Sequence, residues 1–439
     1  MLSFYHFPFT SLSRTLILLF SLFIGGGALL AEDAQTSQKR YTIEECIALA
    51  KKNNQTIAAA EAKIEGAIAD KNEARSAFLP FVSVEGLWDN NSQSLAGDLT
   101  QFQNFNTSTA VGITTKLAIW DFGSSLNRLK AGRVRIDASK MKRDYTFLVV
   151  EEQVRTAYLK ILEKEKFVDV IESSFTTLSQ QLKTSQQLHK QGIAKSTDVL
   201  TVQVQLASEE KKLLQAKNEV LRERMALNHL IGLPISENIA LEDVAENACI
   251  FSVDQVTKYA LEHRPDFLAM QKELKALQHD KSAAQLSMAP QLYAFANGNY
   301  SYANDHKAAA SAGLGLKIDL YKGGMREAAI DKIDSQIQVI KASLQDLHEM
   351  IFLEINNTSL RFEEIQKSFQ IDKQAISLAE ENLENTMKLY QQGIHSINDV
   401  LISKEQLTRV KMNYYYNLYT SHIACVHLIT VTGGYPLKY

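Results

Sequence analysis

The sequence contains little proline, little cysteine and little net charge, and each shortage excludes a class of protein. Its prolines lie only at positions 8, 80, 234, 265, 290 and 436, so long segments lack the residue that most strongly interrupts helices and strands. The formal net charge of -3 at pH 7 gives no electrostatic basis for binding nucleic acid. Cys46, Cys249 and Cys425 are odd in number and far apart, so they imply no disulfide framework.

Motifs of catalysis and metal binding are also missing. The sequence has no phosphate-binding glycine loop, no nucleophile elbow and no zinc pattern. His422, Cys425 and His427 lie close together, but their spacing matches no familiar ligand pattern, which favours core or surface placement over a metal site. We therefore expect a protein that is not an enzyme and that needs no cofactor or metal.

The one strongly apolar run lies near the N-terminus. Arg14 precedes the apolar residues 16–24, and small residues lead to Ala31 before the acidic Glu32 and Asp33. This pattern is typical of a secretory signal peptide at residues 1–31. A retained anchor is the alternative, but a membrane-spanning helix needs about 20 apolar residues. No later segment is apolar enough for such a helix, so we expect membrane contact only through strands.

The most informative feature that is present is an internal repeat. Four pairs of segments match in order: 43–53 with 253–263, Pro80 with Pro290, 191–193 with 392–394, and 198–200 with 399–401. The first two pairs are offset by 210 residues and the last two by 201. We assign the nine-residue difference to the first hairpin loop, since loops absorb length changes most easily. The pattern predicts a tandem duplication, with repeats at 41–250 and 251–439.

Each repeat contains a very long segment without glycine or proline. These segments span residues 133–191 and 325–392, and a helix of that length reaches on the order of 90 Å. In each segment, positions taken at alternating steps of three and four residues are mostly apolar. The first series of positions starts at Phe147 and the second at His348. Lys164 interrupts the first seam and three polar residues the second. Such seams are typical of left-handed coiled coils, so we expect these helices to pack lengthwise against partners.

Four segments alternate apolar and polar residues, which predicts strands at about 81–90, 107–120, 291–302 and 307–320. Lengths near ten residues suit tilted outer-membrane strands. Aromatic residues near the strand ends suit the girdles of such proteins, namely Trp88, Trp120, Tyr300, Tyr302 and Tyr321. The polar loop at 90–106 is expected to face outside, and the second loop, at 303–306, is much shorter. One face of a soluble sandwich is the alternative interpretation of these strands.

Four strands cannot close a barrel, because closure around a pore takes at least about eight. An open sheet in lipid would leave backbone groups without hydrogen bonds, at a cost of several kcal/mol each. We therefore expect other copies of the chain to complete the sheet. Three copies would supply twelve strands and a matching tube of twelve helices, and four copies would also close.

Taken together, these segments resemble the TolC-like outer-membrane factor family over essentially the whole mature chain. Residues 119–123 and 320–324 are similar to the family's strand-to-helix turns, which carry Gly123 in the first repeat and Gly323 and Gly324 in the second. The segments 191–193, 198–200, 390–394 and 398–401 are similar to its helix-tip repeats. The match occurs twice and in the same order, which makes it specific.

The resemblance implies an α+β membrane protein. Its fold would be a trimeric 12-stranded β-barrel in the outer membrane, continued by a long α-helical coiled-coil barrel in the periplasm. Its function would be a passive, gated exit duct of a tripartite efflux or type I secretion system, with a periplasmic adaptor protein and an inner-membrane pump or transporter as partners. The cargo stays open among drugs, proteins and metals, because the pump selects it.

The resemblance also implies a periplasmic gate. Asp198, Tyr390 and the residue at position 395 would hold the end closed, and Asp399 would help to ring the entrance. Two positions depart from the family: His395 replaces a permanently basic residue, and Ile402 replaces an acidic one. Because imidazole loses its charge near neutral pH, a pH-sensitive gate follows as a hypothesis. N-capping is the alternative role of both aspartates.

Gly192 and Gly393 would let paired helices turn and dock on adaptor hairpins, and simple C-capping is the alternative. The alternative from a different class of protein is an exported coiled-coil scaffold or adhesin without a pore. It explains the heptad seams, but it leaves the duplicated alternating segments after Pro80 and Pro290 without a reason.

Overall fold

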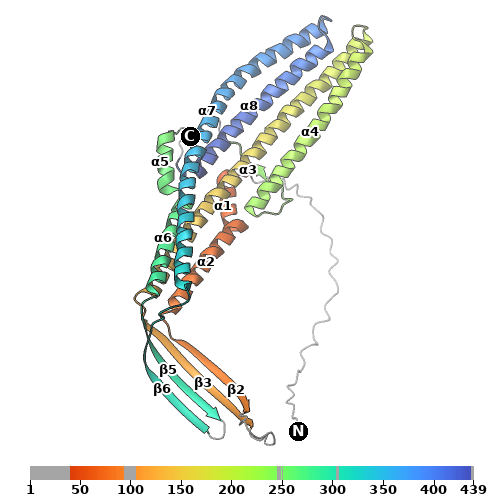
Figure 1. Ribbon diagram of the computed structural model, residues 1–439. Helices are drawn as coiled ribbons and strands as arrows, with labels where there is room; N and C mark the ends of the chain where they lie inside the picture. Colours follow the sequence, from red (N-terminus) through yellow and green to blue (C-terminus); the bar gives the residue numbers. More distant parts are fainter. Residues whose placement is uncertain (1–39, 93–104, 245–248, 250, 303–305, 437–439) are drawn as a thin grey trace, which may run out of the picture. The chain divides into compact units, whose positions relative to one another are not determined.

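The computed structural model describes residues 40–92, 105–244, 249, 251–302 and 306–436, and Figure 1 shows their arrangement. The expected signal peptide at 1–31 lies outside the described residues. So do residues 93–104 and 303–305, which make up most of the two expected hairpin loops. Among the described helices, none is long and apolar enough to cross a membrane.

Two series of elements follow each other along the chain. The first contains α1 (Ile43–Asn53), α2 (Gln55–Ser76), β2 (Phe81–Ser92), β3 (Phe105–Trp120), α3 (Ser124–Lys190) and α4 (Ser196–Ile231). The second contains α5 (Val253–His263), α6 (Pro265–Leu286), β5 (Gln291–Tyr302), β6 (His306–Lys317), α7 (Met325–Gln391) and α8 (Ile397–Val431). Helices at the same place in the two series have nearly equal lengths, with 67 residues in both α3 and α7 and 22 in both α2 and α6.

The four long strands form one antiparallel sheet in the order β2-β3-β5-β6. The hairpin connections differ by nine residues, which is the difference between the two repeat offsets. β6 ends at Lys317, so the expected strand at 307–320 was too long at its C-terminal end. The physical reason lies in the partner strand, because Lys317 pairs with Gln291, the first residue of β5 after Pro290. Residues 318–320 therefore lie beyond the end of β5.

The long helices lie lengthwise beside one another. In the half away from the sheet the order is α4, α3, α8, α7, as the neighbouring labels in Figure 1 show. In the half next to the sheet, α3 contacts α2 and α6, and α6 contacts α7. The heptad seams are largely buried: Val154 and Ile161 in α3 and Ile351 and Ile355 in α7 are completely or almost completely enclosed. The seam residues therefore pack between helices, as the 3.5-residue period predicted.

Two equivalent close contacts hold the C-terminal ends of α4 and α8 in place. Gly232 follows α4 with φ +74°, and an added Cβ would lie 2.4 Å from Cβ of Asn53. Gly433 follows α8 with φ +76°, and an added Cβ would lie 2.7 Å from Cα of Arg264. Each glycine thus packs against the junction of the two short helices that begin its own series. Only glycine combines a left-handed backbone with so little space.

The segment between the two series is bound to the helices beside it. The short strands β1 (Arg40–Tyr41) and β4 (Ala240–Leu241) pair in parallel. The hydroxyl of Tyr158 donates to the carbonyl of Glu242 at 2.6 Å and accepts from its amide at 2.8 Å. In the apolar core around them, α1, α3, α4 and α8 meet. The inter-repeat segment is therefore an integral part of the helical wall.

A disulfide bond corrects one expectation from the sequence. Cys249 of the inter-repeat segment is bonded to Cys425 of α8, with a Cα–Cα distance of 6.2 Å, whereas the sequence implied no disulfide. The two residues are 176 positions apart, so no local spacing indicated the pair. Cys46 is free and buried. A disulfide suits an exported protein, because oxidising compartments maintain such bonds.

Candidate functional site

The ends of the long helix pairs contain both glycines expected at the helix tips. Gly192 and Gly393 have φ +77° and +75°, in the left-handed region. After each glycine the chain turns back on the helix: the amide of Ile193 donates to the carbonyl of Leu188 at 2.9 Å, and Ile394 repeats this with Leu389 at 3.0 Å. Both glycines therefore act as C-caps. The two turns are neighbours, because a Cβ on Gly393 would lie 3.9 Å from Cγ2 of Ile193.

The two aspartates expected at the gate cap the helices that follow these turns. The carboxylate of Asp198 accepts a hydrogen bond from the amide of Lys195 at 3.2 Å. That of Asp399 accepts from the amide of Ser396 at 2.9 Å and from its hydroxyl at 2.7 Å. Each aspartate is thus the third residue of its helix and closes a capping box, whereas the N-cap residues, the role that was the alternative for both aspartates, are Lys195 and Ser396. These bonds use one oxygen of each carboxylate.

His395 and Asp399 are close to each other, with 3.4 Å between Nδ1 and Oδ2. Hydrogen bonds from Ser396, and then from His395, hold the pKa of the Asp399 carboxyl below its usual value. Within the residues that the structure describes, no hydrogen bond joins Asp198 to Tyr390 or to His395. Of the four residues expected at the gate, only His395 and Asp399 contact each other within the described part of a single chain.

Tyr390 lies inside the helix bundle. Its side chain is 5% exposed, and its hydroxyl lies 3.1 Å from Oγ of Ser185, which is fully buried. Apolar side chains from three helices surround the ring, namely Val202, Leu383, Ile397 and Val400. Sequence reasoning missed Ser185, because a serine on a polar stretch of helix gives no signal before its neighbours are known.

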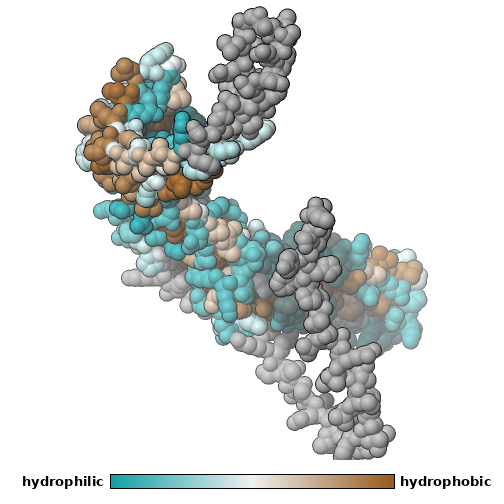
Figure 2. Space-filling view, turned by 90° about the horizontal axis from the view of Figure 1, so that it is seen from below, coloured by the Kyte–Doolittle hydropathy of each residue, from teal (hydrophilic) through white to brown (hydrophobic). Residues whose placement is uncertain are grey.

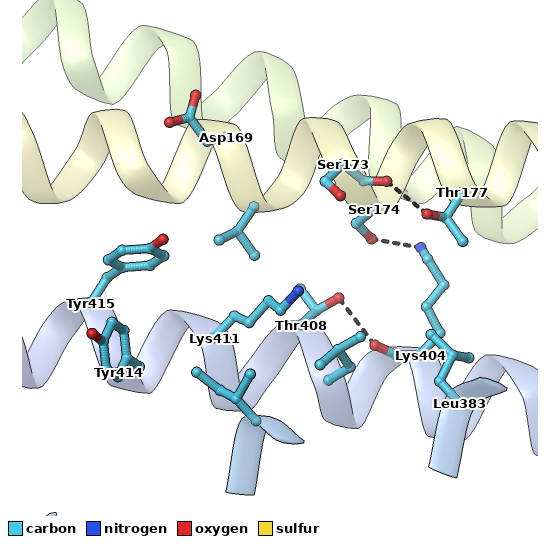
Figure 3. Close-up of a pocket in the computed structure, with 13 residues that line it drawn as sticks. Asp169, Ser173, Ser174, Thr177, Leu383, Lys404, Thr408, Lys411, Tyr414 and Tyr415 are labelled. Carbon is cyan, nitrogen blue, oxygen red and sulfur yellow. Dashed lines mark hydrogen bonds between the residues drawn. The ribbon is translucent and has the colours of Figure 1, made fainter. Parts of the chain in front are cut away.

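A second buried polar group joins α3, α4 and α8 further along the helices. Nζ of Lys404 donates to Oγ of Ser174 at 2.6 Å, and this hydroxyl donates to Oε1 of Glu209. All three side chains are more than nine-tenths buried. Figure 3 shows Lys404 reaching from α8 toward Ser174, beside a cavity of about 320 Å³. Burial lowers the pKa of Lys404 to about 8, although Glu209 opposes this shift.

The strand-to-helix turns depend on glycine in the same way as the tips. Gly123 has φ +91°, and Gly323 and Gly324 have φ +59° and +77°. In the first turn the carboxylate of Asp121 accepts from the amides of Gly123 at 3.1 Å and Ser125 at 2.6 Å. These bonds satisfy amides at the start of α3, which has no earlier helical turn to supply acceptors. The glycines singled out from the sequence therefore direct each strand into its helix.

The register of the sheet sorts its side chains onto two different faces. Residues that pair across neighbouring strands point to the same face, and successive residues alternate. One face, named here the apolar face, carries Val82, Val84, Trp88, Val111, Ile113, Leu292, Ala294, Ala296, Tyr300, Tyr302, Ala308, Ala310, Ala312, Leu314 and Leu316. Figure 2 shows hydrophobic residues along the outer side of the curved sheet.

The opposite face, named here the polar face, carries Ser83, Glu85, Thr114, Lys116, Asn297, Asn299, Ser301 and Ser311. Phe81, Leu87, Tyr293 and Phe295 also lie on it, and the rings of Tyr293 and Phe295 cover Gly315 and Gly313 of β6. On the apolar face Val84 is 67% exposed, Trp88 71% and Leu314 70%, so no part of the chain that the structure describes covers them. A sheet with an uncovered apolar face is the reverse of a soluble sandwich, which buries that face.

Comparison with known proteins places these features in a family. A sequence model described as outer membrane efflux protein matches residues 46–233 and 256–434. No curated protein matches the sequence.

Among solved structures, the chain is similar to the outer membrane protein VceC from Vibrio cholerae, with 17% identity, a TM-score of 0.76 and coverage of 89% of this chain and 96% of that one. It is also similar to the CmeC outer membrane channel of Campylobacter jejuni, with 15% identity, a TM-score of 0.76 and coverage of 89% and 85%. The open state of the MtrE outer membrane channel of Neisseria gonorrhoeae has 16% identity, a TM-score of 0.71 and coverage of 89% of both chains. The TM-scores establish a shared fold, and identities this low establish nothing beyond the fold.

Proposed function

Since the chain belongs to the outer membrane efflux protein family, we propose that it is a passive, gated exit duct in the outer membrane. The duct would take substrates from an inner-membrane pump or transporter through a periplasmic adaptor protein, in a tripartite efflux or type I secretion system. The observation that carries this proposal is the sheet, which has an uncovered apolar face, a polar opposite face and two free edges.

The two faces fit lipid on one side and water on the other. Outer-membrane strands alternate apolar residues toward lipid with polar residues toward the lumen, and aromatic residues gather at both interfaces. Trp88, Tyr300 and Tyr302 lie at the hairpin end of the apolar face, and Trp120 lies at the helix end. Strands of 12 to 16 residues are long enough to cross the hydrocarbon region at a tilt.

The free edges support assembly from several copies. β2 and β6 are the outer strands of the sheet, and lipid supplies no hydrogen bonds to their backbone. The outer helices of the same chain carry rows of exposed apolar residues near heptad spacing. These are Leu200, Val204, Leu214, Leu221 and Met225 on α4, and Val339, Leu353, Leu360, Ile371 and Leu378 on α7.

A neighbouring copy would cover both the strand edge and the helix row on each side. Three copies of this four-stranded sheet would supply twelve strands and close the cylinder, so we propose a homotrimer. Its barrel would lie in the outer membrane and its helical tube in the periplasm. The matched close contacts of Gly232 and Gly433 support an origin by tandem duplication, with repeats at 41–250 and 251–439.

The helix tips are the proposed periplasmic gate. Asp198, Tyr390, His395 and Asp399 all lie within one or two helical turns of Gly192 or Gly393. The carboxylates of Asp198 and Asp399 each have a second oxygen that suits contacts across neighbouring copies, where repetition around the ring multiplies a modest energy, whereas the hydroxyl of Tyr390 is already bonded to Ser185 within one chain. Ile193 and Ile394 are 57% and 68% exposed at the turns, which suits docking of adaptor helices on the tips.

The proposal is tested on the purified full chain. We expect it to require detergent, to have the mass of three copies by light scattering, and to form ion-conducting pores in planar lipid bilayers. Pull-down with candidate adaptor and pump proteins then identifies the system and its cargo. A water-soluble monomer without conductance would exclude the duct and would favour an exported scaffold or adhesin.

A further inference from the structure

A groove between α2 and α3 lies where these helices leave the sheet (Figure 1). It has a volume of about 350 Å³ and is lined by three cationic and three apolar residues, namely Lys71, Arg75, Phe78, Leu126, Leu129 and Arg133. The two helices approach closely here, since a Cβ on Gly132 would lie 3.1 Å from Cα of Lys71. Arg75 lies in the last turn of α2 and Leu126 in the first turn of α3, so the groove begins directly beside the sheet.

The three cations of this groove have no acidic partner. No carboxylate lines the groove. Within the described part of the chain, none of the side chains of Lys71, Arg75 and Arg133 takes part in an ion pair or a hydrogen bond. Like charges that share a groove repel each other, and an anion bound between them relieves the repulsion and gains charge-assisted hydrogen bonds. The groove therefore offers a place for an anionic group.

The second series of elements shows the same position with its charges balanced. Because α6 and α7 have the same lengths as α2 and α3, Lys281 of α6 corresponds to Lys71. In the same way Asp334 of α7 corresponds to Arg133. Nζ of Lys281 lies 2.7 Å from Oδ1 of Asp334, so an ion pair closes this position. The groove between α2 and α3 thus lacks an anion that the second series supplies from its own chain.

The excess of positive charge extends along the start of α3. Residues 124–143 contain seven lysines and arginines but a single acidic residue, Asp137. The corresponding stretch of α7, residues 325–344, contains three of each. Ion pairs hold only part of the charge in α3, at Arg135, Lys142 and Arg143. Unbalanced basic segments beside a membrane attract anionic lipid headgroups.

Exposed apolar residues continue from the sheet into the groove. Trp120 lies at the helix end of the apolar face, and its ring meets that of Phe122 edge to face, with 6.2 Å between centroids. Phe122 comes just before α3, and in the groove Phe78 and Leu126 are 43% and 45% exposed. Aromatic and apolar groups in such a place suit the interface of a bilayer rather than a water-filled lumen. Unpaired cations beside exposed apolar groups match the chemistry of a phospholipid, whose phosphate adjoins acyl chains.

We propose that the groove between α2 and α3 binds the headgroup of an anionic phospholipid. Lys71, Arg75 and Arg133 would surround its phosphate, and Phe78 and Leu126 would lie against the start of its acyl chains. The inference rests on the proposed function, in which this end of the helices meets the periplasmic leaflet of the outer membrane. A zwitterionic headgroup is a poorer match, because its ammonium group finds no carboxylate in the groove. The site occurs once in each copy of the chain.

The test uses the purified and delipidated full chain in an uncharged detergent. Native mass spectrometry during titration with phosphatidylglycerol or phosphatidylcholine measures how much of each lipid the protein retains. We expect saturation at one phosphatidylglycerol per copy and a preference over phosphatidylcholine of roughly tenfold or more. Inorganic phosphate at the same concentration should not displace the lipid, since it makes no apolar contacts. If phosphate displaces the lipid as well as more lipid does, the groove is a site for a free ion and the proposal is wrong.

A double variant and a matched control locate the site. Lys71→Gln with Arg133→Gln should weaken binding of phosphatidylglycerol about thirtyfold, because each cation beside an anionic lipid contributes about fivefold. Lys130→Gln with Lys140→Gln removes the same charge from exposed positions of α3 outside the groove, so it should bind like the wild type. An equal loss in the two double variants would mean a diffuse attraction by α3 and no defined site.

Arg133→Asp tests the comparison between the two series. The new carboxylate should pair with Lys71 as Asp334 pairs with Lys281, which fills the groove from within the chain. We expect this variant to lose the preference for phosphatidylglycerol and to keep the thermal midpoint of the lipid-free wild type. Undiminished lipid binding by Arg133→Asp would contradict the proposal.

The outcomes separate this inference from the duct itself. A wild-type chain that is a water-soluble monomer without conductance excludes the proposed function. A trimer that conducts but retains phosphatidylglycerol and phosphatidylcholine equally keeps the duct and overturns the lipid site. Should Lys71→Gln with Arg133→Gln fail to assemble, the lipid preference of the wild type and its loss in Arg133→Asp carry the test.

Discussion

The hydroxyl groups of Ser185 and Tyr390 lie 3.1 Å apart, although the two residues are separated by 205 positions in the chain. The bond joins α3 to α7 one turn before Gly393, and both residues are buried. Tyr390 was expected to act at the gate through Asp198. Within one chain its hydroxyl instead ties the two helix pairs together, α3/α4 and α7/α8.

Tyr390→Phe should loosen this joint. The variant leaves the hydroxyl of Ser185 buried without its partner, at a cost of about 1–3 kcal/mol. We expect a lower thermal midpoint and a higher open probability in planar bilayers. Adding Ser185→Ala should recover part of the stability, because no unpaired hydroxyl then remains. Full additivity of the two changes would show that the bond contributes nothing.

The Cys249–Cys425 disulfide should stabilise the region between the repeats. The bond closes a loop across a separation of 176 residues, and disulfides typically contribute about 2–4 kcal/mol. We expect Cys249→Ser with Cys425→Ser to unfold at lower denaturant concentration than the wild type. Cys46→Ala is the control, since that thiol is free. A reducing agent should lower the midpoint of the wild type and leave that of the double variant unchanged.

Gly433→Ala should be much more destabilising than Gly192→Ala. Both glycines have a left-handed backbone, which costs an alanine about 1–2 kcal/mol. At Gly433 the added methyl group would also press against Cα of Arg264 at 2.7 Å, whereas nothing lies within 4 Å at Gly192. Thermal unfolding of the two variants measures the difference. Gly232→Ala should be about as destabilising as Gly433→Ala, because the added methyl group would press against Asn53 as closely as it would against Arg264 at Gly433.

The two sheet faces should respond differently to the same substitution. Val84→Arg puts a cation on the apolar face, at a cost of about 2–4 kcal/mol if that residue faces the middle of the bilayer. Ser83→Arg, one residue earlier, puts the cation on the polar face. We expect the first variant to reduce the yield of heat-resistant trimer, and the second to alter conductance and ion selectivity. The reverse pattern would mean that the faces are assigned the wrong way round.

A pH effect should occur at the helix tips. Hydrogen bonds from Ser396 and His395 hold the pKa of the Asp399 carboxyl below its usual value, so a change of conductance between pH 5 and 8, the range in which histidines commonly act as switches, is not caused by this carboxylate. The contact between His395 and Asp399 should therefore weaken as pH rises through this range. We expect wild-type conductance to increase from about pH 5 to 8, and that of His395→Gln to stay constant. A wild-type conductance that is independent of pH in this range would refute a role for His395.

Much of the architecture follows from local patterns. The apolar residues at steps of three and four, such as Val154 and Ile161, can be buried only along one side of a helix, which requires a partner helix. Alternation after Pro80 and Pro290 fixes strand position and the two faces, since neighbouring side chains in a strand must point to opposite sides. Glycines such as Gly192 and Gly393 reveal the turns, because other residues rarely adopt a positive φ.

The helices, the strands and the turns are therefore predictable from the sequence, because each depends on residues a few positions apart. The contact of Cys249 with Cys425, that of Lys404 with Ser174 and Glu209, and the pair of Tyr390 with Ser185 appear only in the folded chain. These residues are ordinary in their local context. Their chemistry arises from burial beside partners that are mostly about two hundred positions away, and only the packing of the helix pairs selects those partners.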